Sequence, residues 1–389
     1  MGELRKPTRM GELREPTCMG KLRKPERNIM ERVINFAAGP AAMPLPVLQE
    51  IEKDLVNYKG TGLSVMEMSH RSKMYEAIIN EAREDLKNIL NLNDGYDILF
   101  LQGGASLQFA MVPLNLANEG DLAYYAVTGN FANKAWEEAK KWLNAIDLTN
   151  SMEDKFNYIP EIPVDKIDSS ARYLHITANN TIFGTMYDKV PEVPVPLVAD
   201  VSSNILGKNY DYRKFALAYA GAQKNLGPAG LTIVIIDKRY LKENENKYVP
   251  TMLRYDIHSK NNSLYNTPPT FGIYVAGLTF KWVKSMGGVA ELEKRNIEKA
   301  NMLYDILDHS DFYIPFAKKE SRSIMNVTFN LKTEELEAKF VEEAKAKGMI
   351  NLKGHRVLGG IRASIYNAIS TNEVQKLAEF MEIFEKNYR

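Results

Sequence analysis

The chain has little sulfur with which to do chemistry, because Cys18 is the single cysteine among 389 residues. A lone thiol cannot close a disulfide within the chain, and it excludes a metal site built from several cysteines. The five histidines form no cluster with the spacing of metal ligands, so we predict no metal site. A chain this poor in cysteine is typical of a reducing compartment, and we expect a cytoplasmic protein.

The chain also lacks an excess of either charge, since it has 50 basic residues, 49 acidic ones and a net charge of +1. This balance favours neither nucleic acid nor an anionic membrane as a partner. No apolar run approaches the roughly 20 residues that a membrane-spanning helix needs, and no apolar signal-peptide core stands at the N-terminus. If the protein binds anions, it must do so with cations at particular positions.

Residues 1–27 consist of three copies of one nonapeptide and contain few apolar residues. Because such a stretch cannot build a core, we predict a disordered tail over residues 1–33. A transit peptide is a weaker alternative, since such peptides are usually poor in acidic residues and the repeats contain four glutamates. Each copy begins with methionine, so a start of translation at Met19 or Met30 is a third alternative.

From about Asn35 the pattern becomes that of a globular protein. Apolar side chains recur with a helical period over residues 75–90 and predict an amphipathic helix, and residues 133–143 predict another. Short apolar runs predict buried strands at residues 97–104, 122–129, 171–179, 196–203, 215–222 and 230–237. Such alternation indicates a mainly parallel α/β sheet with covered faces, in which ligands lie at the carboxyl ends of the strands.

After about residue 290 the pattern changes to that of a smaller α+β domain. Its predicted elements are helices at 290–308 and 333–347 and strands at 325–331 and 361–367. A last helix opens with Ser370 and Glu373, which have the spacing of a capping box.

The strongest local feature is residues 220–230 (AGAQKNLGPAG), in which Lys224 stands among small and apolar residues between two apolar strands. Burial among such neighbours lowers the pKa of a lysine, and the neutral amine can then attack a carbonyl to form a Schiff base. The alternative is a solvated lysine in a turn, which is the common case for an isolated lysine. The features that follow favour the buried amine.

Asp200 ends the apolar run PLVAD. A carboxylate there can keep the pyridine nitrogen of a cofactor protonated, although an aspartate that caps a turn is a common alternative. The Gly-rich turn at residues 103–106 precedes a helical stretch, so its N–H groups and the helix dipole suit a phosphate. Most glycine-rich turns only reverse the chain, so this turn is weak evidence by itself.

Two of the five histidines precede an arginine, in His70–Arg71 and His355–Arg356, and Arg362 follows the second pair. A substrate with both a phosphate and a carboxylate needs such cations, with arginine giving bidentate contacts. Surface charge paired with nearby acids is the alternative.

Five segments resemble the phosphoserine aminotransferase family: residues 64–72, 101–104, 220–235, 265–271 and 352–368. The similarity runs in order from about Asn35 to the C-terminus. It implies the α/β fold of type I pyridoxal-phosphate enzymes. A large cofactor-binding domain, residues 46–290, would hold a mainly parallel seven-stranded sheet, and residues 34–45 and 291–389 would form a smaller α+β domain.

The resemblance also implies an activity. Such enzymes exchange an amino group between glutamate and 3-phosphohydroxypyruvate, which gives phosphoserine and 2-oxoglutarate in serine biosynthesis. The reaction is reversible and ping-pong, and pyridoxal 5'-phosphate is the cofactor. Lys224 matches the lysine that holds this cofactor as a Schiff base and moves a proton once the substrate amine displaces it.

The same match implies the roles of the other cofactor contacts. Asp200 would pair with the pyridinium nitrogen, and Thr181 would contact the phenolic oxygen side of the ring. The cofactor phosphate would be held by Ala105 and Ser106 through their backbone, by Gln223, and across the interface of a homodimer by Asn266 and Thr267.

For the substrate, the match implies that Arg362 grips the α-carboxylate. The substrate phosphate or the glutamate side chain would be bound by His70, Arg71, His355 and Arg356.

One position departs from the family, because Phe131 stands where relatives usually carry a tryptophan over the cofactor ring. Phenylalanine has a smaller surface and no indole N–H, so we expect a retained site with weaker cofactor binding.

The main alternative is another aminotransferase of this fold, of the alanine or glyoxylate type, which would not need the His–Arg pairs. A cysteine desulfurase is disfavoured because Cys18 lies in the tail. A non-catalytic binding protein is disfavoured because Lys224, Asp200 and the arginines are present.

Overall fold

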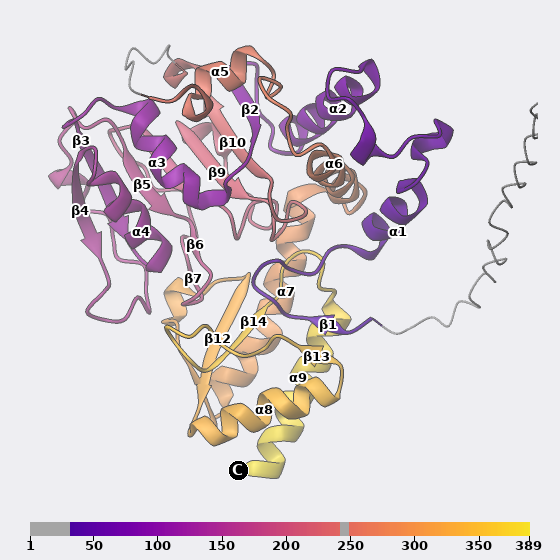
Figure 1. Ribbon diagram of the computed structural model, residues 1–389. Helices are drawn as coiled ribbons and strands as arrows, with labels where there is room; N and C mark the ends of the chain where they lie inside the picture. Colours follow the sequence, from indigo (N-terminus) through magenta and orange to yellow (C-terminus); the bar gives the residue numbers. More distant parts are fainter. Residues whose placement is uncertain (1–31, 242–248) are drawn as a thin grey trace, which may run out of the picture. The chain divides into compact units, whose positions relative to one another are not determined.

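The computed structural model describes residues 32–241 and 249–389. All of these except Arg32 belong to one compact unit, Val33–Arg389 (Figure 1). The predicted disordered tail, with Cys18 and the two later methionines, lies outside the described residues except for its last two positions.

The centre of this unit is a seven-stranded sheet with the strand order β2-β10-β9-β8-β5-β3-β4. The strands are β2 (Tyr96–Leu101), β3 (Leu122–Val127), β4 (Asn144–Asn150), β5 (Leu174–Thr177), β8 (Leu197–Asp200), β9 (Leu217–Gly221) and β10 (Thr232–Asp237). β10 runs antiparallel to its neighbours β2 and β9, whereas the other neighbouring pairs are parallel. The predicted mainly parallel seven-stranded sheet is confirmed.

Six helices accompany the sheet: α1 (Leu45–Asp54), α2 (Lys73–Ile89), α3 (Gly104–Leu116), α4 (Asn130–Ala139), α5 (Tyr255–Lys260) and α6 (Thr270–Ser285). On one face, Tyr75 of α2 and Ile273 of α6 share an apolar core with Ala218 of β9. On the other face, Phe109 of α3 shares a second core with Tyr219 of β9. Consecutive residues of β9 therefore enter opposite cores, as expected for a strand with both faces buried.

The C-terminal part carries a three-stranded antiparallel sheet in the order β11-β12-β14. Its elements are α7 (Gly288–His309), β11 (Tyr313–Pro315), β12 (Asn326–Leu331), α8 (Glu334–Ala346), β13 (Met349–Ile350), β14 (Ile361–Ser364) and α9 (Thr371–Tyr388). β13 pairs in parallel with β1 (Ile34–Asn35). β6 (Asn179–Asn180) and β7 (Thr185–Met186) form a separate antiparallel pair, between β5 and β8 in the chain. The predicted capping box of Ser370 and Glu373 opens α9 and is confirmed.

The described residues contain three apolar cores. One core joins Ile34 and Phe36 to side chains between Ala300 and Phe384. The two cores on the central sheet draw on residues between Val47 and Leu292. We therefore keep residues 46–290 as the proposed large domain, and residues 34–45 with 291–389 as the proposed small one.

The apolar patterns left some elements unpredicted. β4 lies at the edge of the sheet and is only partly buried, so its sequence has no continuous apolar run. α6 is buried over five consecutive residues from Ile273 to Gly277, which removes the helical period. α4 begins and ends earlier than the predicted 133–143, because the chain turns after Ala139.

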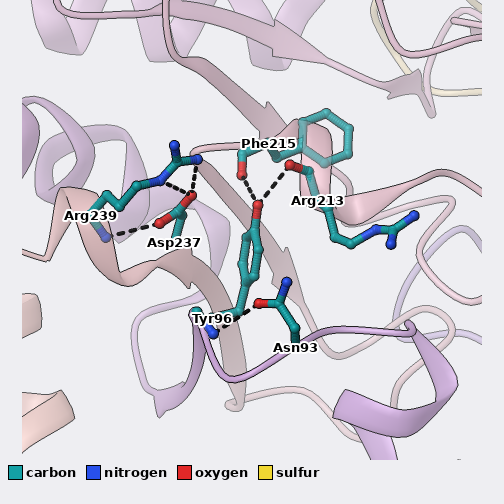
Figure 2. Close-up of polar contacts among 7 residues, drawn as sticks. Asn93, Tyr96, Arg213, Phe215, Asp237 and Arg239 are labelled. Atoms are coloured by element: carbon teal, nitrogen blue, oxygen red, sulfur yellow. Dashed lines mark hydrogen bonds and ion pairs between the residues drawn. The ribbon is translucent and has the colours of Figure 1, made fainter.

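Polar contacts surround the amino end of β2 (Figure 2). The phenol of Tyr96 donates hydrogen bonds to the carbonyls of Arg213 and Phe215, at 2.7 and 3.3 Å. Nearby, Asp237 accepts three from Arg239: from Nε at 2.8 Å, from Nη2 at 2.5 Å and from the backbone N–H at 2.9 Å. The Tyr96 phenol and the Asp237 carboxylate therefore both have hydrogen-bond partners within the protein.

Candidate active site

A cavity of about 270 Å³ lies at the carboxyl ends of β5, β8 and β9, where α/β sheets bind ligands. Strand ends, the turn after β9, the first turn of α3 and a segment of the C-terminal part form its walls. Nine residues predicted from the sequence line it together: Ala105, Ser106, Phe131, Thr181, Asp200, Gln223, Lys224, His355 and Arg362.

The other five predicted residues do not line this cavity: His70, Arg71, Asn266, Thr267 and Arg356. Four of them are exposed, and His70 is half-buried. Asn266 instead lines a separate cavity of about 180 Å³ beside β2. A single protomer therefore brings nine of the predicted residues together and leaves five outside.

Lys224 lies in the turn after β9, and its Nζ donates a 2.7 Å hydrogen bond to Thr181 Oγ1. Burial lowers the pKa of Lys224 to about 8, which Asp200 opposes and Arg362 reinforces. An amine with this pKa is partly neutral near physiological pH and can act as a nucleophile. The Lys224 side chain is partly buried, and its lowered pKa fits the desolvated lysine that the sequence predicted.

Asp200 is the last residue of β8 and is 5% exposed. Its Oδ1 accepts a 2.9 Å hydrogen bond from the backbone N–H of Ser202, as in a capped turn. Burial raises the pKa of Asp200, while the hydrogen bond and the charge of Lys224 act against the rise. A buried carboxylate with so little compensation is stabilised by a cation brought into the cavity.

The amino end of α3 forms a cradle for an anion. Gly103 and Gly104 have φ values of 87° and 64°, which favour glycine, and they turn the chain from β2 into the helix. The N–H groups of a first helical turn, here at Ala105 and Ser106, have no acceptor within the helix, and the helix dipole favours an anion. A Cβ added at Gly104 would meet no atom within 4 Å, so this space is open.

Two buried polar atoms of cavity-lining residues have no hydrogen-bond partner among the described residues: Thr177 Oγ1 and Arg362 Nε. Arg362 Nη1 donates only one long bond, at 3.5 Å, to the carbonyl of Thr181. Unpartnered buried groups cost free energy, so their presence at a cavity indicates a ligand that satisfies them. The donors of a guanidinium suit a carboxylate.

Positive charge gathers around His355. Burial is the largest cause that lowers the pKa of this imidazole, and the charges of Arg362, Arg356 and Lys134 lower it further. Arg356 is thus close enough to act on the cavity wall although it does not line the cavity. The same positive field attracts an anionic substrate.

Phe131 lies in the first turn of α4, and its ring centre is 5.8 Å from Lys224 Nζ. A flat ring at this distance can stack on an aromatic group held at the amine.

Four polar residues of the cavity were missed by the sequence analysis: Thr177, Asn179, Ser202 and Ser203. A signal for them existed, because they end the predicted strands 171–179 and 196–203, where ligands were expected. Ala38 and Gly39 also line the cavity, from the segment between β1 and α1, and no pattern in the sequence indicated them.

A larger cavity, of about 420 Å³, lies among α1, α2 and α6. It has no arginine or histidine in its lining and none of the predicted site residues. Size alone therefore does not identify the reactive site, whereas the buried amine and carboxylate do.

Over residues 32–241 and 249–389, no group of His, Cys, Asp and Glu side chains could hold a metal ion. Among the same residues, no helix combines the length and the apolar character that a membrane span requires.

Comparison with known proteins places these features in context. The family model for class V aminotransferases matches residues 33–377. The phosphoserine aminotransferase of Geobacillus kaustophilus is 53% identical over 360 residues, which cover 92% of this chain and 100% of that protein.

Solved structures give the same result. Phosphoserine aminotransferase from Bacillus circulans subsp. alkalophilus superposes with a TM-score of 0.89 at 46% identity, and the match covers 92% of this chain and 100% of that one. The enzyme from Trichomonas vaginalis, described as bound to PLP, gives 0.84 at 36% identity, with 90% and 100% covered.

The alternative aminotransferase type is more distant. An alanine–glyoxylate aminotransferase from Nostoc sp. gives a TM-score of 0.67 at 18% identity, with 91% of this chain and 95% of that one covered, which shows a shared fold alone. The chain belongs to the phosphoserine aminotransferase family of class V aminotransferases.

Proposed function

We propose that this chain catalyses transamination between glutamate and 3-phosphohydroxypyruvate, giving phosphoserine and 2-oxoglutarate in serine biosynthesis by a reversible ping-pong mechanism. One observation carries the proposal: the buried amine of Lys224, with a pKa of about 8, shares a cavity with Asp200 and Arg362. Relatives about half identical to this chain carry the same activity in their names.

Pyridoxal phosphate is the cofactor that this family implies, and the residues present fit it. The fit rests on a nucleophilic amine, an under-compensated buried carboxylate and an open cradle at the amino end of α3. When bound, this cofactor supplies an aldehyde that accepts amines and a ring that withdraws electrons.

Each fitted residue has a separate task. Asp200 would hold a proton on the pyridine nitrogen, because a buried carboxylate is stabilised by a cation. The backbone of Ala105 and Ser106 would bind the phosphate, together with Gln223. Thr181, which already contacts the Lys224 amine, would donate to the phenolic oxygen side of the ring.

Lys224 would also move the proton of the reaction. A general base works best when its pKa lies near the working pH, and the pKa of about 8 meets this condition. Its amine would take a proton from the substrate α-carbon and return it at the next step.

Substrate anions would be bound by the arginines and histidines. Arg362 has an unpartnered Nε beside the cavity and would grip the α-carboxylate. His355 and Arg356 lie in one positive field and would receive the phosphate or the glutamate side chain. His70 and Arg71 have the same proposed role, and they would have to come from another subunit.

A homodimer with shared active sites is part of the proposal. Asn266 and Thr267 are exposed in the single protomer and do not line its cavity. In the proposed dimer they would reach the cofactor phosphate of the other subunit. A cytoplasmic location, and the absence of nucleic-acid and membrane partners, stay predictions from composition.

A substrate panel tests the function. The purified protein, supplied with pyridoxal phosphate, is expected to turn over phosphoserine with 2-oxoglutarate and to leave alanine with glyoxylate unused. Turnover of alanine without turnover of phosphoserine would favour the alanine or glyoxylate type instead.

Mixing two inactive variants tests the shared site. Lys224→Ala and Thr267→Ala chains, unfolded and refolded together, should regain part of the wild-type turnover, since a mixed dimer keeps one intact site. Each variant refolded alone is the control, and no recovery in the mixture contradicts the shared site.

A further inference from the structure

A buried lysine lies in the C-terminal part, outside the cavity lining. Lys299 of α7 is 2% exposed, and its Nζ donates to the carbonyls of Ile365, Tyr366 and Ile369 at 2.9, 2.9 and 2.8 Å. Burial lowers the pKa of Lys299 to about 7, and the charge of Glu373 opposes this fall. In its protonated form the amine has three N–H bonds, one for each of these acceptors. All three acceptors belong to one turn, residues 365–369, so Lys299 fixes the backbone of that turn.

The turn follows β14, the strand that carries Arg362. The phenol of Tyr366 is 1% exposed and donates a 3.0 Å hydrogen bond to the carbonyl of Ala38, a cavity residue. The phenol also accepts a 3.2 Å hydrogen bond from Asn326 Nδ2. Tyr366 is therefore held in one orientation at the back of the cavity.

Two sets of contacts connect this turn with Lys224 and its neighbour in the chain. The Thr181 hydroxyl lies close enough to the Tyr366 phenol to lower its pKa, against a rise caused by burial, and Thr181 Oγ1 accepts the hydrogen bond from Lys224 Nζ. Asn367, in the same turn, donates its backbone N–H to Asn225 Oδ1 at 3.1 Å. Asn225 is the residue after Lys224.

We propose that Lys299 is a positioning residue for Lys224: it holds the turn 365–369, and through it the Tyr366 phenol, so that the Thr181 hydroxyl faces the amine. This proposal rests on the proposed function and deepens it. It explains why α7 carries a lysine at a buried position, where an apolar side chain would pack without desolvating a polar group.

The test measures the Lys224 amine itself, in protein freed of cofactor. Acetic anhydride labels neutral amines, and mass spectrometry of the Lys224 peptide over a pH series gives the pKa of that amine. Tyr366→Phe is expected to lower this pKa by roughly half a unit to one unit, because the protonated amine loses an oriented acceptor. Lys299→Met should shift it in the same direction.

Lys299→Met should also act on substrate binding. The strand that carries Arg362 leads directly into the loosened turn, so KM for glutamate is expected to rise about tenfold. Tyr366→Phe keeps the backbone contacts of Lys299 and should raise KM by less.

Lys208→Met is the matched control. This lysine is also largely buried, and it forms ion pairs with Asp188 and Glu293 at 2.9 and 3.0 Å. Its loss should lower the unfolding temperature and leave the labelling pKa of Lys224 unchanged.

A lower unfolding temperature in Tyr366→Phe and Lys299→Met, with the Lys224 pKa of the wild type, would mean a merely structural role and overturn the proposal. If Lys299→Met does not fold, the labelling pKa of Lys224 in Tyr366→Phe decides whether the proposal holds. Labelling needs no substrate, so a wild-type protein inactive on phosphoserine would count against the proposed function and leave this result standing.

Discussion

The two ends of the strands in the central sheet differ in how their polar groups are used. Where β2 begins, the phenol of Tyr96 donates to two carbonyls and Asp237 is bonded by Arg239 (Figure 2). Where β5 and β8 end, Asp200 accepts a hydrogen bond from the backbone N–H of Ser202, and Thr177 Oγ1 has no partner among the described residues. Polar groups that are hydrogen-bonded within the protein stabilise the fold, whereas polar groups without such a partner are available to bind a ligand.

Lys224→Ala should have the largest effect and abolish catalysis at the carboxyl ends of the strands. Without the amine, turnover of glutamate with 3-phosphohydroxypyruvate should fall at least about a thousandfold, because both the covalent and the proton-transfer roles are lost. The absorbance of protein-bound cofactor should disappear with it.

Lys214→Ala is the control for this change, since Lys214 forms an ion pair with Glu192 on the surface, away from the cavity lining. Undiminished turnover in Lys224→Ala would contradict the assigned role.

Asp200→Asn should have the next largest effect. The neutral amide cannot hold a proton on the pyridine nitrogen, so kcat should fall about a hundredfold with the fold unchanged. Asp200 also raises the pKa of Lys224, so that pKa should drop below its value of about 8. Steady-state kinetics and amine labelling check the two effects, and wild-type kcat would exclude the assigned contact.

Capture of pyridoxal phosphate by cofactor-free protein should depend on pH. The neutral amine attacks, so the rate should rise with pH and level off above about 8, because burial lowers the pKa of Lys224 from 10.5. Below that pH, each unit should slow capture about tenfold, since the neutral fraction falls in proportion. Stopped-flow absorbance measures the rate, and a midpoint near 10.5 would mean a solvated amine.

Phe131→Trp should strengthen cofactor binding modestly. A larger ring above the cofactor adds stacking area, so cofactor binding is expected to tighten about threefold. Equilibrium dialysis compares the variant with wild type. Weaker binding would show that the cavity is fitted to the smaller ring.

Tyr96→Phe should have the smallest effect on activity. The phenol gives up its two carbonyl acceptors, so the free energy of unfolding should fall by about 1 kcal/mol. Urea denaturation measures the change, and kcat should equal that of wild type. A loss of kcat would mean that the two ends of the strands are coupled.

Much of the fold could be read from local patterns. The six predicted apolar runs became strands of the central sheet, because buried strands leave a signal within a few residues. β4 and α6 left none, since one is half-exposed and the other is buried on most sides. The antiparallel direction of β10 was also not predicted, because strand direction depends on connections and not on side chains.

The site likewise has features that the sequence indicated and contacts that only the structure showed. The chemical types in it followed from short motifs: an amine among small residues, a carboxylate at a strand end and a glycine turn before a helix. The contact of Thr181 with Lys224, and the hold of Lys299 on residues 365–369, join segments far apart in the chain.

The sequence by itself determined which reactive groups exist and which elements carry them, because residue type and short-range periodicity are local properties. The tertiary structure alone decided that nine of the predicted residues share one cavity, how far the pKa of Lys224 falls, and which polar atoms remain without a partner. The physical reason is that burial and hydrogen bonding are set by neighbours brought together only when the chain folds.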